Sequence, residues 1–199
     1  MPGLQTFSMT RTLGPDDLEE TVDILCEAFR DYPVMRFVLR DSPDSAADLR
    51  ALVHFFAAVR FHREEVLRGT PGEGALTGVA LISYPGRGAA PPETAALRDE
   101  TWARIGSGAR ERYETFGAAA GSIEVGRPHI HLNMIGVRDG GRGTGLGRRL
   151  LEAVLAMQVP AEAVRRQWLA DQVHDLRALT GALACGARCR CRRSPVRAF

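Results

Sequence analysis

The sequence predicts an α/β (α+β) fold in which a mixed central sheet is flanked by helices. Apolar residues recur at helical spacing before residue 65 and again after residue 145. Two apolar runs of strand length lie between these segments, and a glycine-rich turn joins the second run to the following helix. Strands that alternate with amphipathic helices are typical of a sheet covered by helices.

The composition is that of one globular domain. The chain has 199 residues, of which 45% are hydrophobic and 25% are charged, as in ordinary globular domains. It has no apolar run long enough to span a membrane, and residues 1–10 lack the basic and apolar regions of a secretory signal. We therefore expect a cytoplasmic protein that does not bind membranes.

The first third of the chain predicts a short strand and two helices. Residues 5–13 alternate weakly and suit the strand, and Pro15 with the two aspartates after it opens the first helix. This helix is expected to stop near Tyr32, because a residue before proline is pushed out of the helical region. Apolar turns predict the second helix over residues 46–65.

The middle of the chain predicts two strands separated by helical structure. Residues 76–84 are apolar on both faces, which indicates a central strand. Two prolines open a helical region over residues 91–120, with a break near residues 106–108. Residues 129–137 are the next strand, and they lead directly into the glycine-rich turn.

The glycine-rich turn predicts an anion site. Glycines at positions 140, 141, 143, 145 and 147 allow a tight turn whose N–H groups can approach a ligand. The N-terminus of the amphipathic helix that follows favours negative charge. Arg142, Arg148 and Arg149 add positive charge at the same place. A phosphate group is therefore the expected ligand.

The spacing of the turn discriminates between phosphate ligands. A nucleotide P-loop requires a lysine, which the chain lacks, and the dinucleotide pattern Gly-x-Gly-x-x-Gly fits none of these glycines. The pattern Arg-x-x-Gly-x-Gly does fit, at Arg142, Gly145 and Gly147. With a strand before it and a helix after it, this motif resembles the acetyl-coenzyme A loop of the GCN5-related N-acetyltransferases. The resemblance covers roughly residues 5–156, and the alternative is a glycine-rich surface turn.

The resemblance implies an acyl-CoA N-acyltransferase-like fold and the activity of that family. Residues 1–156 would form a domain that binds acetyl-coenzyme A without a metal and transfers the acetyl group to the primary amine of a small molecule, with no specific nucleic-acid partner. The implied cofactor-binding residues lie at the strand end and in the loop: Ile135, Gly136, Val137, Arg142, Gly143, Thr144, Gly145, Leu146, Gly147 and Arg148. The implied acceptor pocket lies in the loop over residues 29–37 and is lined by Phe29, Tyr32 and Phe37.

A histidine is the predicted catalytic base. When an amine attacks a thioester, a base must first remove a proton from the ammonium group. His129, His131 and Asn133 project to one face of their strand by its period of two. His131 is the histidine closer to the cofactor loop, so it is the better candidate, acting directly or through water. A hydrogen-bonded structural histidine is the alternative.

The resemblance ends after Ala156. The family continues with further strands and a tyrosine that protonates the leaving thiol, whereas the last tyrosine here is Tyr113. We therefore expect the C-terminal strands to be missing or replaced, and residues 157–199 to form an atypical tail with a helix over 161–179. A frameshift, a divergent terminus and a functional basic or metal-binding tail are three explanations, although its three cysteines lack the second pair of a zinc finger.

Two main functions therefore follow from the sequence, and a nucleic-acid-binding module formed by the basic tail is a third possibility. One is an acetyl-coenzyme A dependent N-acetyltransferase. The other is a truncated or frameshifted remnant that binds coenzyme A without catalysis, because the family's C-terminal tyrosine is missing. The acceptor and the oligomeric state are not predicted.

Overall fold

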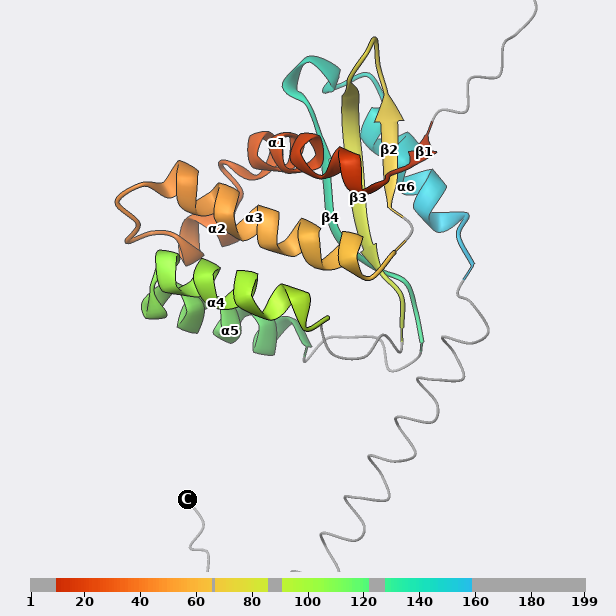
Figure 1. The fold of residues 1–199 in the computed structure, drawn as a ribbon. Helices are drawn as coiled ribbons and strands as arrows, with labels where there is room; N and C mark the ends of the chain where they lie inside the picture. Colours follow the sequence, from red (N-terminus) through yellow and green to blue (C-terminus); the bar gives the residue numbers. More distant parts are fainter. Residues whose placement is uncertain (1–9, 66, 86–90, 122–127, 159–199) are drawn as a thin grey trace, which may run out of the picture.

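A four-stranded sheet forms the centre of the molecule (Figure 1). The computed structural model describes residues 10–65, 67–85, 91–121 and 128–158. The strands lie in the order β1-β2-β3-β4, and every neighbouring pair is antiparallel. Their bounds are Arg11–Thr12 for β1, Arg68–Pro71 for β2, Leu76–Ser83 for β3 and His131–Val137 for β4. The predicted sheet flanked by helices is confirmed, although the parallel pair that a mixed sheet requires is not among the described strands.

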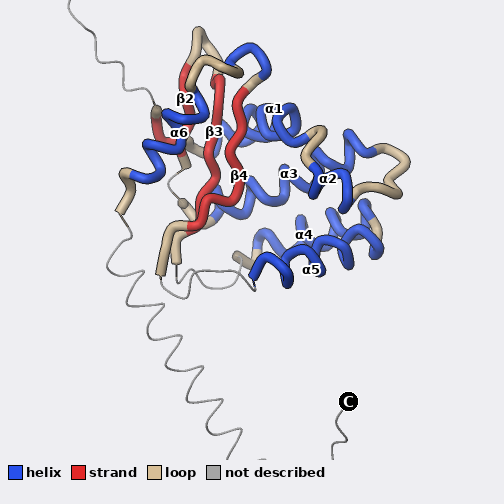
Figure 2. Tube along the Cα trace, turned by 180° about the vertical axis from the view of Figure 1, so that it is seen from behind, coloured by secondary structure: helices blue, strands red, loops and turns tan. Residues whose placement is uncertain are grey.

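Helices cover both faces of this sheet (Figures 1 and 2). Helix α1 (Leu18–Phe29) packs against β3 and β4 on one face together with α3 (Ser45–His62), and α6 (Leu146–Leu155) packs on the opposite face. Helix α4 (Glu93–Ile105) packs against α3, and α5 (Ser107–Gly121) packs against both α4 and α2 (Pro33–Val38). Two short 3-10 turns, η1 (Pro15–Asp17) and η2 (Asp139–Gly141), precede α1 and α6.

Strand β3 is the centre of the core. Its residues 79–82 have no exposed surface, since β2 and β4 flank the strand and helices cover both of its faces. This confirms the sequence prediction of a central strand over residues 76–84. Glycines allow close packing on either side: a Cβ at Gly136 would lie 3.0 Å from Ala28 Cβ of α1, and one at Gly78 would lie 3.0 Å from Leu150 Cδ1 of α6.

Polar contacts and proline set the ends of α1. The Asp17 carboxylate accepts a hydrogen bond of 2.8 Å from the N–H of Gly14 and two from the guanidinium of Arg11. These contacts lower the pKa of Asp17, chiefly through the hydrogen bonds from Arg11. At the other end, Tyr32 is extended before Pro33, as predicted. The predicted break near residues 106–108 is also confirmed, because Gly106 has a φ of +95° and separates α4 from α5.

Two elements differ from the sequence prediction. The segment 29–37, predicted as a loop, contains most of α2, which begins with Pro33 at its first position. Strand β2 was not predicted, because it has only four residues and these include Gly69 and Pro71, which have weak strand propensity. The strand is recognised only by its pairing with β1 and β3.

The predicted boundaries differ by a few residues elsewhere. Strand β4 begins at His131 rather than at residue 129, and α3 ends at His62 rather than at residue 65. Residues 5–9 of the first predicted strand, the predicted helix over 161–179 and the arginine-rich tail lie outside the described residues. Among the described helices, none is both long enough and apolar enough to cross a bilayer.

Candidate functional site

Strand β4 positions both halves of the candidate site. Its pairing with β3 shifts register, since Leu81 opposes Met134 while Ile82 opposes Leu132, so that Asn133 has no cross-strand partner. The side chain of Val137 lies on the α6 face, where a Cβ on Gly147 would meet it at 3.8 Å. Strict alternation would place Asn133 on that face too, but the bulge turns its side chain toward α3.

The glycine-rich turn begins where β4 ends. The N–H of Arg138 donates to Thr77 O at 2.9 Å, and its Nε donates to Leu76 O at 3.0 Å. The same guanidinium lies 3.5 Å from the Glu20 carboxylate and 3.6 Å from that of Glu27, which ties the strand end to α1. The start of the turn is therefore fixed by contacts with both β3 and α1.

Backbone conformation within the turn requires glycine. Gly143 and Gly145 have φ values of +77° and +83°, and nothing lies within 4 Å of the Cβ position of either residue. A Cβ on Gly141 would lie 2.8 Å from Leu146 Cδ1 and 2.9 Å from Val137 Cγ1. Gly141 is therefore required for packing, whereas Gly143 and Gly145 leave open space beside the backbone.

Backbone donors converge at the N-terminus of α6. Thr144 N–H donates to Gly141 O and Arg149 N–H donates to Gly145 O. Within the described residues, the N–H groups of the first three α6 residues, Leu146 to Arg148, have no backbone acceptor. Free donors at a helix N-terminus are the arrangement that binds phosphate.

The arginines of the loop are exposed and paired with acids in the same segment. Arg142 Nε lies 2.9 Å from the Asp139 carboxylate, and Arg148 Nε lies 2.7 Å from that of Glu152. An ion pair of Arg149 is not found among the described residues. Both ion pairs are made through Nε, and the neighbouring acid offsets part of each positive charge, which reduces what Arg142 and Arg148 would contribute to anion binding.

A groove of about 350 Å³ runs between β4 and α6. It brings together five of the predicted cofactor-binding residues: Ile135, Gly136, Val137, Gly147 and Arg148. The remaining ones, Arg142 to Leu146, belong to the exposed turn beside it or to the start of α6. The groove therefore links the free donors of α6 to the backbone of β4.

A second hollow, of about 520 Å³, lies on the other side of β4 and is called the aromatic cavity below. Its walls come from α1, α2, α3, β3, α5 and β4. Phe29 and Tyr32, predicted to line an acceptor pocket, lie in this cavity with ring centroids 5.1 Å apart, and the predicted base His131 lines it as well. Leu132 and Ile135 line both the cavity and the groove, so the two hollows meet along β4.

Phe37 does not join the other two aromatic residues. It lies on α2 outside the cavity, 43% exposed, with the Arg40 guanidinium 5.8 Å from its ring centroid. The structure does not bring Phe37 together with Phe29 and Tyr32, because Pro33 starts a helix that places Phe37 outside the cavity.

The contribution of Arg60 to the polar part of the aromatic cavity was not predicted from the sequence. Arg60 Nε donates to Asn133 Oδ1 at 3.1 Å and lies 3.4 Å from the buried carboxylate of Glu65, and Ser83 Oγ donates to the same Asn133 oxygen at 2.7 Å. Asn133 thus accepts from α3 and β3 at once. The bulge makes this possible.

Tyr113 and Arg60 sit close enough to influence each other's ionisation. Burial raises the pKa of Tyr113, and the charge of Arg60 acts in the opposite direction. Burial likewise lowers the pKa of Arg60, and the charge of Glu65 partly offsets this effect.

The sequence does contain a signal for the residues of the cavity wall. Phe56 and Arg60 are four apart on α3, and Tyr113 and Phe116 are three apart on α5, so each pair shares a helix face.

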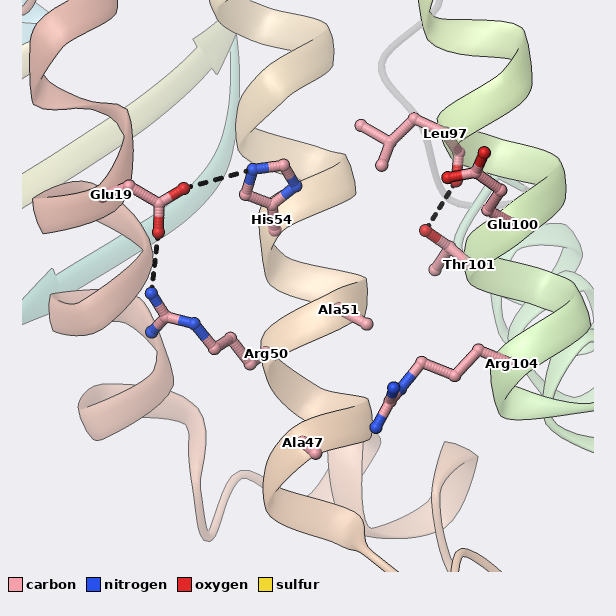
Figure 3. A pocket seen from close by; sticks show the side chains of 9 residues that line it. All are labelled: Glu19, Ala47, Arg50, Ala51, His54, Leu97, Glu100, Thr101 and Arg104. Atoms are coloured by element: carbon pink, nitrogen blue, oxygen red, sulfur yellow. Dashed lines mark hydrogen bonds and ion pairs between the residues drawn. The ribbon is translucent and has the colours of Figure 1, made fainter.

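A third hollow, of about 460 Å³, lies between α1, α3 and α4 (Figure 3). Glu19 stands between His54 and Arg50, at 3.4 Å and 2.8 Å, while Ala47 and Ala51 lie between the charged groups. None of its lining residues lines the groove or the aromatic cavity. This hollow is therefore separate from the candidate site. Within the described residues, no group of three or more metal-ligating side chains is found.

Comparison with known proteins supports a fold assignment. Neither a family model nor a curated protein matches the chain. A solved structure from Corynebacterium glutamicum, described as "histone acetyltransferase HPA2 and related acetyltransferase", matches with a TM-score of 0.51 and 22% identity, over 74% of this chain and 70% of its own. A second structure, described as an acetyltransferase, has a TM-score of 0.37 and 18% identity over 73% of this chain and 71% of its own. The chain is therefore similar in fold to this Corynebacterium glutamicum acetyltransferase over about 74% of its length.

Proposed function

We propose that this protein transfers an acetyl group from acetyl-coenzyme A to the primary amine of a small molecule. The observation that carries the proposal is the meeting of the two hollows at Leu132 and Ile135. One hollow begins at the free backbone donors of α6, and the other is a cavity of about 520 Å³, within the size range of small-molecule sites. The likeness in fold to an acetyltransferase supports the same reaction.

The residues of the turn fit the diphosphate of coenzyme A. The N–H groups of Leu146, Gly147 and Arg148 would donate to phosphate oxygens, and the open space beside Gly143 and Gly145 would admit the ligand close to the backbone. The groove along residues 135–137 would hold the pantetheine arm, whose amides can pair with backbone groups at the edge of β4 that pairs with none of the described strands. When bound, the ligand supplies an acetyl group as a reactive thioester.

The side chains of the aromatic cavity then prepare the amine. His131 would take one proton from the ammonium group of the acceptor, so that the nitrogen regains its lone pair. The nitrogen forms a bond to the acetyl carbon while the carbon–sulfur bond breaks, and the second proton leaves the nitrogen for the sulfur. The products are an amide and a thiol, and the proton on His131 returns to solvent.

A non-catalytic coenzyme A-binding protein is the second candidate. One observation favours it: the last tyrosine in the chain is Tyr113, so the tyrosine that the family places after residue 156 to protonate the thiol is missing. Such a protein would keep the groove and its donors but would not turn over.

Binding and turnover separate the two candidates. Calorimetry with coenzyme A, and with pantetheine as a control that lacks the diphosphate, measures the anion site. Thiol release from acetyl-coenzyme A with a panel of primary amines measures transfer. Preference for coenzyme A together with amine-dependent thiol release supports the transferase, and preference without release supports the binding protein. Equal affinity for coenzyme A and pantetheine contradicts both.

A further inference from the structure

The charge of the aromatic cavity is unusual for a site that receives an ammonium group. Among its described lining residues, Arg60 is the one side chain that carries a permanent charge, and no carboxylate lines it. A cavity that selected its ligand by the ammonium group alone would be expected to present an acid to it. The charge that lines this cavity is suited to an anion instead.

Arg60 is held so that part of its guanidinium remains available. Its Nε donates to Asn133 and faces the buried carboxylate of Glu65, at 3.1 Å and 3.4 Å. Its two terminal nitrogens have no hydrogen-bond acceptor among the described residues. The two terminal nitrogens of a fixed guanidinium match the two oxygens of a carboxylate. Burial lowers the pKa of Arg60, and a bound carboxylate would stabilise the charged form that burial disfavours.

The rest of the cavity wall is apolar and rich in aromatic rings. Phe29 and Tyr32 lie on the α1 side, and Phe56, Tyr113 and Phe116 lie on the side of α3 and α5. Phe56 and Tyr113 stack with centroids 5.3 Å apart. Such walls favour a large apolar group on the ligand through burial of apolar surface.

We propose that the acceptor is an α-amino acid with a large apolar side chain, bound through its carboxylate by Arg60. This inference rests on the proposed function and adds the class of acceptor. Arg60 is fixed to Asn133, which lies two residues from both His131 and Ile135 on β4, or roughly 6.6 Å along a strand. A carboxylate held there places the adjacent α-amine near His131 and near the junction of the two hollows, while the apolar side chain lies among the rings.

Two matched ligand pairs test this inference on the unaltered full chain. N-acetyl-L-phenylalanine and N-acetyl-2-phenylethylamine differ only in the carboxylate, and calorimetry compares their affinities without any need for turnover. L-phenylalanine and 2-phenylethylamine make the same comparison as acceptors in the thiol-release assay. We expect the carboxylate to improve binding, and kcat/KM if transfer occurs, by about 10- to 100-fold.

Variants connect the effect to Arg60. Arg60→Lys keeps a positive charge but loses the bidentate fork, so it should remove most of the preference for the carboxylate ligand while changing binding of the neutral ligand little. Arg63→Gln is the matched control, because it removes a charge three residues away that does not line the cavity. Circular dichroism checks that each variant folds.

The outcomes distinguish this inference from the proposed function. Preferential binding of N-acetyl-L-phenylalanine that Arg60→Lys removes and Arg63→Gln retains supports the carboxylate site, even if no amine is acetylated. Acetylation of 2-phenylethylamine at least as fast as L-phenylalanine overturns the inference but leaves the transferase intact. Equal affinity for the two N-acetyl ligands, or equal effects of the two variants, also overturns it.

Discussion

The two sides of β4 are built by different means. On the α6 side, the groove and its donors come mainly from one continuous stretch, residues 135–148, and its binding groups are mostly backbone N–H groups. On the α3 side, the aromatic cavity draws its walls from six elements, and its polar groups include the side chains of Arg60, Asn133 and His131. The first side therefore depends on local backbone conformation, and the second depends on tertiary packing.

This difference separates what is general from what is specific in the site. A backbone cradle at a helix N-terminus binds a diphosphate whatever the remaining ligand is, and glycines with positive φ are enough to form it. In the proposed function, the side chains that line the aromatic cavity would determine which acceptor binds. Changes on the groove side should therefore alter cofactor affinity, and changes on the cavity side should alter turnover and acceptor choice.

Substitution of the proposed base should have the largest effect. His131→Asn removes the group that accepts the ammonium proton, so turnover should fall by about 10²- to 10⁴-fold. Coenzyme A affinity should be unchanged, because His131 lines the cavity and not the groove. Thiol release and calorimetry measure the two quantities.

The neighbouring histidine is the control for this test. The His129 ring lies 6.2 Å from that of His131, centroid to centroid, but does not line the cavity. His129→Asn should therefore retain most of the activity. Similar losses in both variants would contradict a catalytic role for His131.

Substitution in the glycine turn should have the next largest effect, and this effect should be on coenzyme A affinity. Gly145→Asp places a carboxylate in the open space beside the first N–H groups of α6, where it should repel the diphosphate. Gly145→Asn is the matched control, because asparagine also tolerates a positive φ but is neutral. We expect coenzyme A to bind about 10-fold or more weakly to the aspartate variant than to the asparagine variant.

This pair of variants also tests whether the aromatic cavity binds its ligand independently of the glycine turn. Binding of an N-acetylated amino acid in the aromatic cavity should be the same in both variants, because Gly145 lies in the exposed turn. If the two variants bind coenzyme A equally, then the α6 terminus is not the diphosphate site.

The comparison explains which features could be predicted from the sequence. The central strand, the glycine turn and α6 follow from apolar periodicity and glycine spacing within short windows, and the structure has all three. The role of Arg60 could not be predicted, because its partner Asn133 is 73 residues away and faces α3 only through a bulge. The position of Phe37 could not be predicted for a related reason, since the short helix α2 changes which side chains face the cavity.

The smallest expected effect is on the pH dependence of stability, and it tests how buried the cavity wall is. Burial raises the pKa of Tyr113 in the folded protein above its value of about 10 in the unfolded chain. The unfolded state therefore loses this proton first as the pH rises. The contribution of Tyr113 is fully present below about pH 10 and is lost as the pH rises through the folded pKa.

Tyr113→Phe removes this ionisation, so the free energy of unfolding should fall less steeply above about pH 10 in the variant than in the unaltered protein. Urea denaturation at a series of pH values measures the slope. Tyr32→Phe controls for the loss of a tyrosine from the same cavity, because the Tyr32 ring is 45% exposed. If the two variants reduce the slope equally, then Tyr113 is as open to water as Tyr32, and the cavity side does not depend on tertiary packing as described above.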